Sequence, residues 1–251
     1  MAGRHVVPLP SIREADVMWC KRVWRIIPLD EKINLPLKYP STHSTRDRLN
    51  LIDVIHDAAM EGTLTVYKSY SNGGGDDEFT TPLSQIEVAA IEEGGDTTDV
   101  VDPTTLETTR KWVPRHFERD RVYKWRIKED WFFDKQRSVM DVRIIGIAPM
   151  VQVVSLETGE SKGDKELYWV YFPEARNILV NHEVFNRFND AERRSFDDIF
   201  MKRMFSSYIT KEANVFDRTV STYKTNPLDA LLEAEKIKQD IFNMEHDVWE
   251  Y

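Results

Sequence analysis

Four segments in which apolar and polar residues alternate follow one another closely in the middle of the chain. They span residues 122–128, 138–148, 150–156 and 167–172, with turn-forming residues at 157–164. Alternation with a period of two is typical of a β-strand that buries one face. The connections are shorter than the roughly twelve residues that parallel neighbours need. The sequence therefore predicts an antiparallel β-meander.

Helical patterns lie on both sides of this meander. Ser11 and Glu14 have the spacing of a capping box, and apolar residues recur every three or four positions until Pro28. Further helices are predicted over residues 45–61, 81–94, after the capping-box pair Ser195 and Asp198, and from Pro227 to the C-terminus. The expected fold class is α+β, an antiparallel β-meander flanked by N-terminal and C-terminal helices.

The chain is expected to form one domain preceded by an arm. Pro8 and Pro10 oppose helix formation, so residues 1–10 are predicted to form an extended N-terminal arm. Such an arm suits strand addition or groove binding on a neighbouring molecule. Residues 11–251 would form a single α+β domain, in which the polar, threonine-rich stretch near 96–119 is a long surface loop.

The last helix carries apolar residues at three-four spacing. They are Ala234, Ile237, Ile241, Met244 and Val248. Because this seam is short for a coiled coil, we interpret it as the face with which the helix docks on its own domain.

Charge and cysteine content narrow the possible functions. The 43 acidic and 34 basic residues give a net charge of −9, which argues against nucleic acid as the main partner. The single cysteine, Cys20, excludes an intramolecular disulfide, and its place in a predicted helix favours a buried structural thiol. No apolar run is long enough to cross a bilayer. The first ten residues lack a signal-peptide core, so both a cytoplasmic protein and one with its signal removed stay open.

The sequence shows no pattern of catalytic, cofactor-binding or metal-ligating residues. No two histidines have the i,i+4 spacing of helical metal ligands, and no serine stands in a nucleophile elbow. Glu129, Asp130 and Asp134 are close enough in sequence to suggest a pair of hydrolytic carboxylates. The alternative is that they are solvated turn residues, or partners of the nearby arginines Arg126, Arg137 and Arg143. Spacing alone favours this alternative.

Blocks of large aromatic residues enclosed by charged ones recur along the chain, and this composition is typical of recognition surfaces. Trp131, Phe132 and Phe133 cannot all face one core from a strand, so at least one must point elsewhere. An exposed interface and packing beneath the 96–119 loop are both open explanations. The residues predicted to contact partners are Val6, Val7, Leu9, Trp131, Phe132, Phe133, Arg137 and Trp249.

The same blocks resemble the gliding motility protein GldN family, called PorN in non-gliding relatives. They read READVMW at residues 13–19, WR at 24–25, EDWFFDK at 129–135, RIIGIAP at 143–149 and KEAN at 211–214. The resemblance extends over nearly the whole chain, to the ending EHDVW at 245–249.

This resemblance implies a non-enzymatic structural subunit of the type IX protein secretion and gliding motility apparatus. It also implies a periplasmic location and association with the outer membrane through a lipoprotein partner, protein K, with which the subunit forms a ring of neighbouring copies. The periplasmic region of the motor protein M is a further expected contact. No catalytic residue, cofactor or metal follows from the resemblance. The alternative is a peptidoglycan-binding or wall-tethering module, because exposed aromatic residues stack on sugars.

Overall fold

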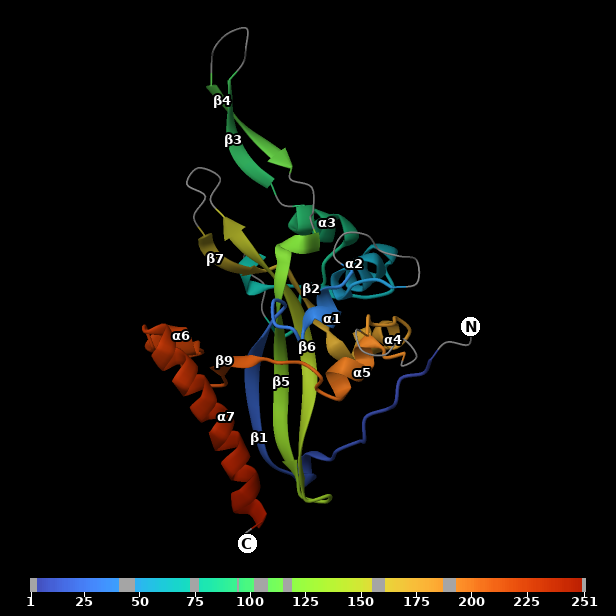
Figure 1. The fold of residues 1–251 in the computed structure, drawn as a ribbon, viewed down its shortest axis with the longest axis vertical. Helices are drawn as coiled ribbons and strands as arrows, with labels where there is room; N and C mark the ends of the chain where they lie inside the picture. Colours follow the sequence, from blue (N-terminus) through green and yellow to red (C-terminus); the bar gives the residue numbers. More distant parts are fainter. Residues whose placement is uncertain are drawn as a thin grey trace.

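A seven-stranded antiparallel sheet forms the centre of the computed structural model, which describes residues 4–40, 48–72, 77–93, 95–101, 108–114, 119–154, 161–186 and 193–249. The strand order is β2-β8-β6-β5-β1-β9, and β7 pairs with β6 (Figure 1). The bounds are β1 Val17–Pro28, β2 Val66–Lys68, β5 Val122–Asp134, β6 Val139–Val154, β7 Ser161–Glu166, β8 Tyr168–Tyr171 and β9 Tyr208–Glu212. With helices near both ends of the chain, this arrangement confirms the predicted α+β class.

The prediction of a helix between Ser11 and Pro28 is wrong. Only a 3-10 turn at Glu14–Asp16 precedes β1, which pairs with β5 on one side and β9 on the other. Five consecutive residues of β1, from Val23 to Ile27, are buried because both faces of the sheet are covered there. A strand buried on both faces loses its alternation, so its apolar residues also fit a helical period.

The strand β6 is longer than the sequence predicts. The segments at 138–148 and 150–156 were expected to be two strands, but they form one strand through Pro149. At that point the neighbour of β6 changes from β8, which pairs as far as Ile147, to β7, which pairs from Met150. The proline therefore lies at a change of partner, and the β5 ladder continues past it.

The structure has helices where four of the patterns predict them. They are α2 Leu51–Glu61, α3 Gln85–Glu93, α5 Phe196–Met201 and α7 Pro227–Trp249. Both hydrogen bonds of the capping box between Ser195 and Asp198 are formed at α5. Gly62 ends α2 with a φ of 74°, a conformation that favours glycine. Within the described ranges the structure also has the helices α1 Leu35–Lys38, α4 Phe172–Leu179 and α6 Val220–Tyr223, which the sequence patterns did not predict.

The region predicted to be a long loop near 96–119 contains a β-hairpin instead. Strand β3, Gly95–Val101, pairs with β4, Thr108–Pro114, in a separate two-stranded sheet. The hairpin lies beyond α3, at the far end of the molecule from the C-terminal end of β5 (Figure 1). The hairpin therefore does not cover the aromatic triplet, Trp131, Phe132 and Phe133. The structure does not support the explanation that this triplet packs beneath the segment near 96–119.

Hydrophobic clusters among the described residues hold the fold together. The main core packs the sheet against helices α1, α2, α4 and α5. The second core joins Val23 and Ile209 of the sheet to Ala234, Ile237 and Ile241 of α7. The docking of α7 on its own domain is therefore confirmed. In the described part of the chain, no helix combines the length and apolar character needed to span a lipid bilayer.

The third cluster lies on the opposite face of β1, where Trp24 packs with Trp169 and the partly buried Phe79. Neighbouring strand residues point to opposite faces, and Val23 belongs to the second core. Phe79 lies so close to β6 that a Cβ atom at Gly146 would stand 2.4 Å from its ring. Only glycine leaves room for this ring without a shift of the backbone or of the ring itself.

Candidate interaction surfaces

The aromatic triplet is mostly internal. Phe132 and Phe133 are each 4% exposed, so the expectation that they form part of an exposed contact surface is not met. Trp131 is partly buried and packs against the second core beneath α7. Because side chains alternate along β5, Phe132 points to the other face of the sheet, where the Arg143 guanidinium lies 5.5 Å from its ring centre. At least one of the three does point away from the other two, as predicted.

A buried ion pair fixes Trp131 in place. Glu129 is 0% exposed and accepts hydrogen bonds from Arg203 at 2.8 and 3.2 Å and from the indole nitrogen of Trp131 at 3.1 Å. The Arg203 guanidinium lies 5.2 Å from the Trp131 ring centre. The backbone of Arg203 has a φ of 52°, in the left-handed region. A buried carboxylate with three donors is a structural clamp between β5 and the segment after α5.

The other two carboxylates of the hydrolase hypothesis are also held by arginines. Asp130 accepts two hydrogen bonds from Arg22 on β1, at 2.6 and 2.9 Å. Asp134 accepts a hydrogen bond from the Arg137 side chain at 2.6 Å, and this contact lowers the pKa of the Asp134 carboxyl. Of the three arginines that the sequence suggested as partners of these carboxylates, Arg137 is the one that pairs with a carboxylate of this set in the described structure. Each of these carboxylates thus has an arginine as its partner, and the pair joins two strands at Asp130 and fixes a turn at Asp134.

Arg137 and Trp249 were predicted to contact partners. The exposed Arg137 side chain donates to Asp134 and to Asp141 at 3.2 Å, so its charge serves the turn between β5 and β6. Trp249 is the last residue of α7, and its side chain lies outside the described residues.

The N-terminal arm lies against its own chain. Arg176 of α4 donates to the Val7 carbonyl at 3.0 Å, and Arg143 of β6 donates to the Pro10 carbonyl. Arg176 is itself held by Asp197 at 2.8 and 3.2 Å. The arm is therefore bound through its backbone at these two points, and the Arg4 side chain adds a hydrogen bond to the Arg193 carbonyl at 3.2 Å. Val7 and Leu9 keep exposed side chains, and Val6 is half-buried.

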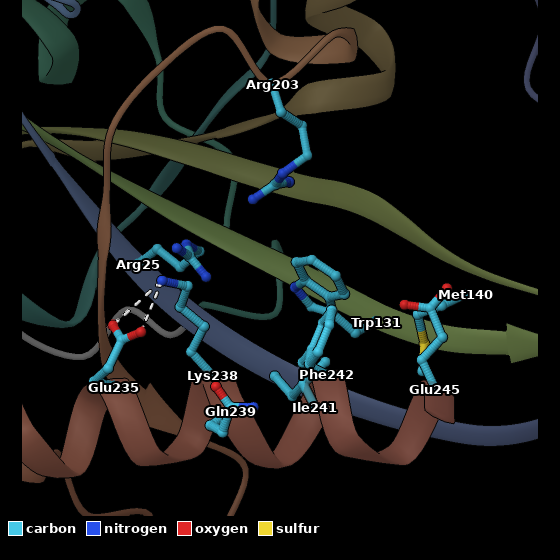
Figure 2. Close-up of a pocket in the computed structure, with 10 residues that line it drawn as sticks. All are labelled: Arg25, Trp131, Met140, Arg203, Glu235, Lys238, Gln239, Ile241, Phe242 and Glu245. Carbon is cyan, nitrogen blue, oxygen red and sulfur yellow. Dashed lines mark hydrogen bonds and ion pairs between the residues drawn. The ribbon is translucent and has the colours of Figure 1, made fainter. Parts of the chain in front are cut away.

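A cleft of about 420 Å³ lies between α7 and the sheet (Figure 2). Trp131 points from β5 toward Ile241 and Phe242 of α7, and Arg25 lies on the strand behind (Figure 2). Burial lowers the pKa of Arg25, which donates to the Ser207 hydroxyl at 2.9 Å. The cations of this cleft are thus used in internal contacts, and the cleft is the seam along which α7 meets the sheet.

A larger groove, of about 790 Å³, opens between α1 and the chain around α5. The described residues that line it are mainly apolar and include Ile33, Tyr39 and Phe185, all of which are exposed. Sequence reasoning missed this groove because its walls come from residues 32–39, 184–186 and 194–204, which no local pattern connects.

A second apolar surface lies at the start of α7, where Leu228, Leu231 and Leu232 are 62%, 57% and 61% exposed. Leu228 and Leu232 lie on the far side of the helix from the seam of Ala234, Ile237 and Ile241, and Leu231 lies between them and the seam. A signal for them was present in the sequence, because apolar residues outside the docking seam of a helix need a second partner.

The segment at residues 77–79 shows how the remaining blocks are used. Lys128 is buried and donates to the Asp77 carbonyl at 2.6 Å and to Glu78 at 3.0 Å. The Trp24 indole donates to the Asp77 carboxylate at 2.7 Å.

Among the described residues, no three histidine, cysteine, aspartate or glutamate side chains gather closely enough to hold a metal ion. Cys20 is exposed on β1, so the expectation of a buried thiol is wrong.

Comparison with known proteins gives one family match. The model of a family described as "Gliding motility associated protein GldN" matches residues 12–250. No curated protein matches the chain.

Proposed function

We propose, from the premise that this chain belongs to the GldN family of gliding motility associated proteins, that it acts as a non-enzymatic structural subunit of the type IX secretion and gliding motility apparatus. The observation that carries this proposal is the family match over residues 12–250. It covers the central sheet and every described helix, so it applies to the whole fold and not to one motif.

The side-chain contacts support a structural role. Glu129, Asp130 and Asp134 are each held by an arginine, which leaves them as clamps between strands and turns. Much of the charge in the aromatic blocks is used inside the molecule in this way. Contact with other proteins then falls to surfaces that these blocks do not use.

The proposed partners are an outer-membrane lipoprotein, protein K, neighbouring copies of this chain in a ring, and the periplasmic region of the motor protein M. The proposed location is the periplasm, at the outer membrane through protein K. A ring of identical subunits needs two different patches on each subunit, so that each copy offers one patch to the copy before it and the other to the copy after it. The groove beside α1 and the leucines of α7 are two such apolar surfaces.

The test is co-purification with the lipoprotein K homologue, followed by electron microscopy of the product. Rings or arcs that contain both chains are the expected result. A monomer that does not bind the lipoprotein would contradict the proposal. Asp130→Asn and Asp134→Asn test the non-enzymatic part, because secretion should persist in both variants if neither carboxylate is catalytic.

Peptidoglycan binding is the second candidate function. It rests on Tyr70 and Phe216, two strongly exposed aromatic residues, the second of which has the Arg218 guanidinium 4.4 Å from its ring centre. Aromatic faces of this kind stack on sugars. Sedimentation with purified peptidoglycan in the absence of protein K separates the two functions, and binding that is lost in Tyr70→Ala or Phe216→Ala would favour this one.

A further inference from the structure

We propose that the exposed leucines of α7 in one copy dock into the groove beside α1 of the next copy, in a head-to-tail contact. The leucine patch is defined as Leu228, Leu231 and Leu232, and the apolar groove as the cavity of about 790 Å³ between α1 and the chain around α5. This inference rests on the proposed function, because it names the surfaces by which neighbouring copies would meet.

The apolar groove has the size and lining of a site that receives side chains. Its volume lies within the range of roughly 300–1,000 Å³ that is usual for binding clefts. Leu35, Pro36, Val184, Ile199 and Met204 form much of its wall. The exposed Ile33, Tyr39 and Phe185 extend the apolar surface around it. Contiguous apolar surface of this kind marks an interaction site.

The leucine patch has the spacing of a helix that binds in a groove. Its residues follow i, i+3 and i+4, which places them side by side on one face of α7. The opposite face of the helix, with Ala234 and Ile237, is already buried on the second core. Docking in a groove would therefore cover the exposed face without detaching α7 from its own sheet.

The charges around the two surfaces are complementary. Both charged residues among the described lining of the apolar groove are cations, Lys32 and Arg194. Residues 227–235 of α7 carry the acids Asp229, Glu233 and Glu235 and no base, and Lys236 follows Leu232 by one helical turn. Glu233 pairs with Lys224 at 3.6 Å. Glu235 also pairs with Lys238 at 2.9 Å, so Asp229 supplies the clearer attraction. Opposite potentials of this kind orient two surfaces and disfavour the wrong pairing.

The positions of the two surfaces favour a second copy of this chain as the occupant. The start of α7 lies on one side of the molecule, and α5 lies on the other side of the sheet (Figure 1). Two different patches on opposite sides form a heterologous contact, which each added copy can repeat. An isologous dimer would instead use one patch twice and would leave the other exposed.

Cross-linking of single-cysteine variants tests the contact, with Cys20→Ser as the background in every chain. Leu228→Cys protein is mixed with Ile33→Cys protein and oxidised. We expect at least about ten times more disulfide-linked heterodimer than from a control pair in which Ile86→Cys, a still more exposed position on α3, replaces Leu228→Cys. A yield equal to that of the control would overturn the proposal.

A charge variant provides an independent readout in the same mixture. Leu231→Asp in the Leu228→Cys chain should lower the yield to the control level, because a carboxylate would be buried among apolar side chains. Val215→Asp, at an exposed site outside both surfaces, should leave the yield unchanged. Equal yields from both variants would contradict docking of the leucine patch.

Assembly with the lipoprotein distinguishes failure of this inference from failure of the proposed function. If Leu231→Asp protein still forms rings with protein K, the contact proposed here is wrong and the structural role stands. If the unaltered chain does not bind protein K, but the heterodimer still forms, the proposed function is wrong and the contact stands.

Discussion

At the scale of single residues, the fold depends on a few buried charged side chains, each of which is held by partners nearer the surface. Glu129 with Arg203, and Lys128 with residues 77–78, are the main examples. Such a pair adds little net stability when it is complete, because the buried charge loses its water. The loss of one partner is costly, since the other charge stays buried.

Removal of the Arg203 side chain should therefore destabilise the protein strongly. Arg203→Ala leaves the fully buried Glu129 carboxylate without its guanidinium, and we expect a loss of about 3–5 kcal/mol in the free energy of unfolding. Arg193→Ala, which removes a surface contact with Glu183 at 3.6 Å, should cost at most about 1 kcal/mol. Urea unfolding of both variants measures the difference, and equal losses would show that the buried pair is not a clamp.

Gly146 gives a second prediction at this scale. Gly146→Ala places a methyl group 2.4 Å from the Phe79 ring, and overpacking of this kind costs about 1–3 kcal/mol. Phe79→Leu alone also destabilises, but the double variant should lose less than the sum of the two single losses, because the clash is relieved. A double-mutant cycle measured by thermal unfolding checks this, and strictly additive losses would rule out the close contact as the reason for glycine.

At the scale of elements, local signals in the sequence predict what is determined locally. The capping box of Ser195 and Asp198 identified the start of α5, and Asn226-Pro227 the start of α7. The strand β1 was misassigned because its character depends on pairing with β5 and β9, which are distant in sequence. The apolar groove was missed for the same reason, since its walls are brought together only by the fold. The hairpin β3–β4 was missed because its polar, threonine-rich strands lack a clear apolar period.

The Asp198 carboxylate in the capping box of α5 should make the free energy of unfolding depend on pH. Burial acts to raise the pKa of Asp198, but hydrogen bonds from Ser195 and Lys202 outweigh it and lower the pKa below its usual value. A lowered carboxyl pKa contributes stability above the unfolded pKa of about 3.9, and this contribution is lost as pH falls through the folded pKa. The stability advantage of the unaltered protein over Asp198→Asn should therefore be present at neutral pH and shrink in acid below about pH 4.

Unfolding by urea at several pH values measures this advantage. Asp240→Asn, at an exposed position in the middle of α7, is the control for the removal of one surface carboxylate. An advantage of Asp198 that stays constant into acid would contradict the role of its charge at α5.

At the scale of the whole molecule, the N-terminal arm and α7 both lie outside the main core. The arm is held through its backbone carbonyls by Arg176 and Arg143, while α7 has its own small core. Both parts can therefore change partners with little effect on the central sheet. This is the arrangement expected of a subunit that contacts its neighbours through peripheral segments.

Deletion of residues 1–10 should separate folding from assembly. The described part of the arm makes four hydrogen bonds with the rest of the chain, two accepted from Arg176 and Arg143 and two donated by Arg4. Its loss should therefore lower the free energy of unfolding by less than about 6 kcal/mol and leave the circular dichroism spectrum unchanged. Ring formation with protein K should weaken, because the arm is proposed to reach a neighbour. Unchanged assembly of the truncated chain would limit the arm to a contact within its own molecule.

The placement of α7 also sets an order in which the molecule would yield to mechanical force. The helix follows β9, an edge strand whose ladder on β1 is short, whereas the ladder between β1 and β5 extends along nearly the whole of both strands. A pull on α7 away from the sheet loads the short ladder and the small second core first. The central strands would stay intact while the C-terminal segment detached, so the molecule could lengthen under tension and recover its shape when the tension was released.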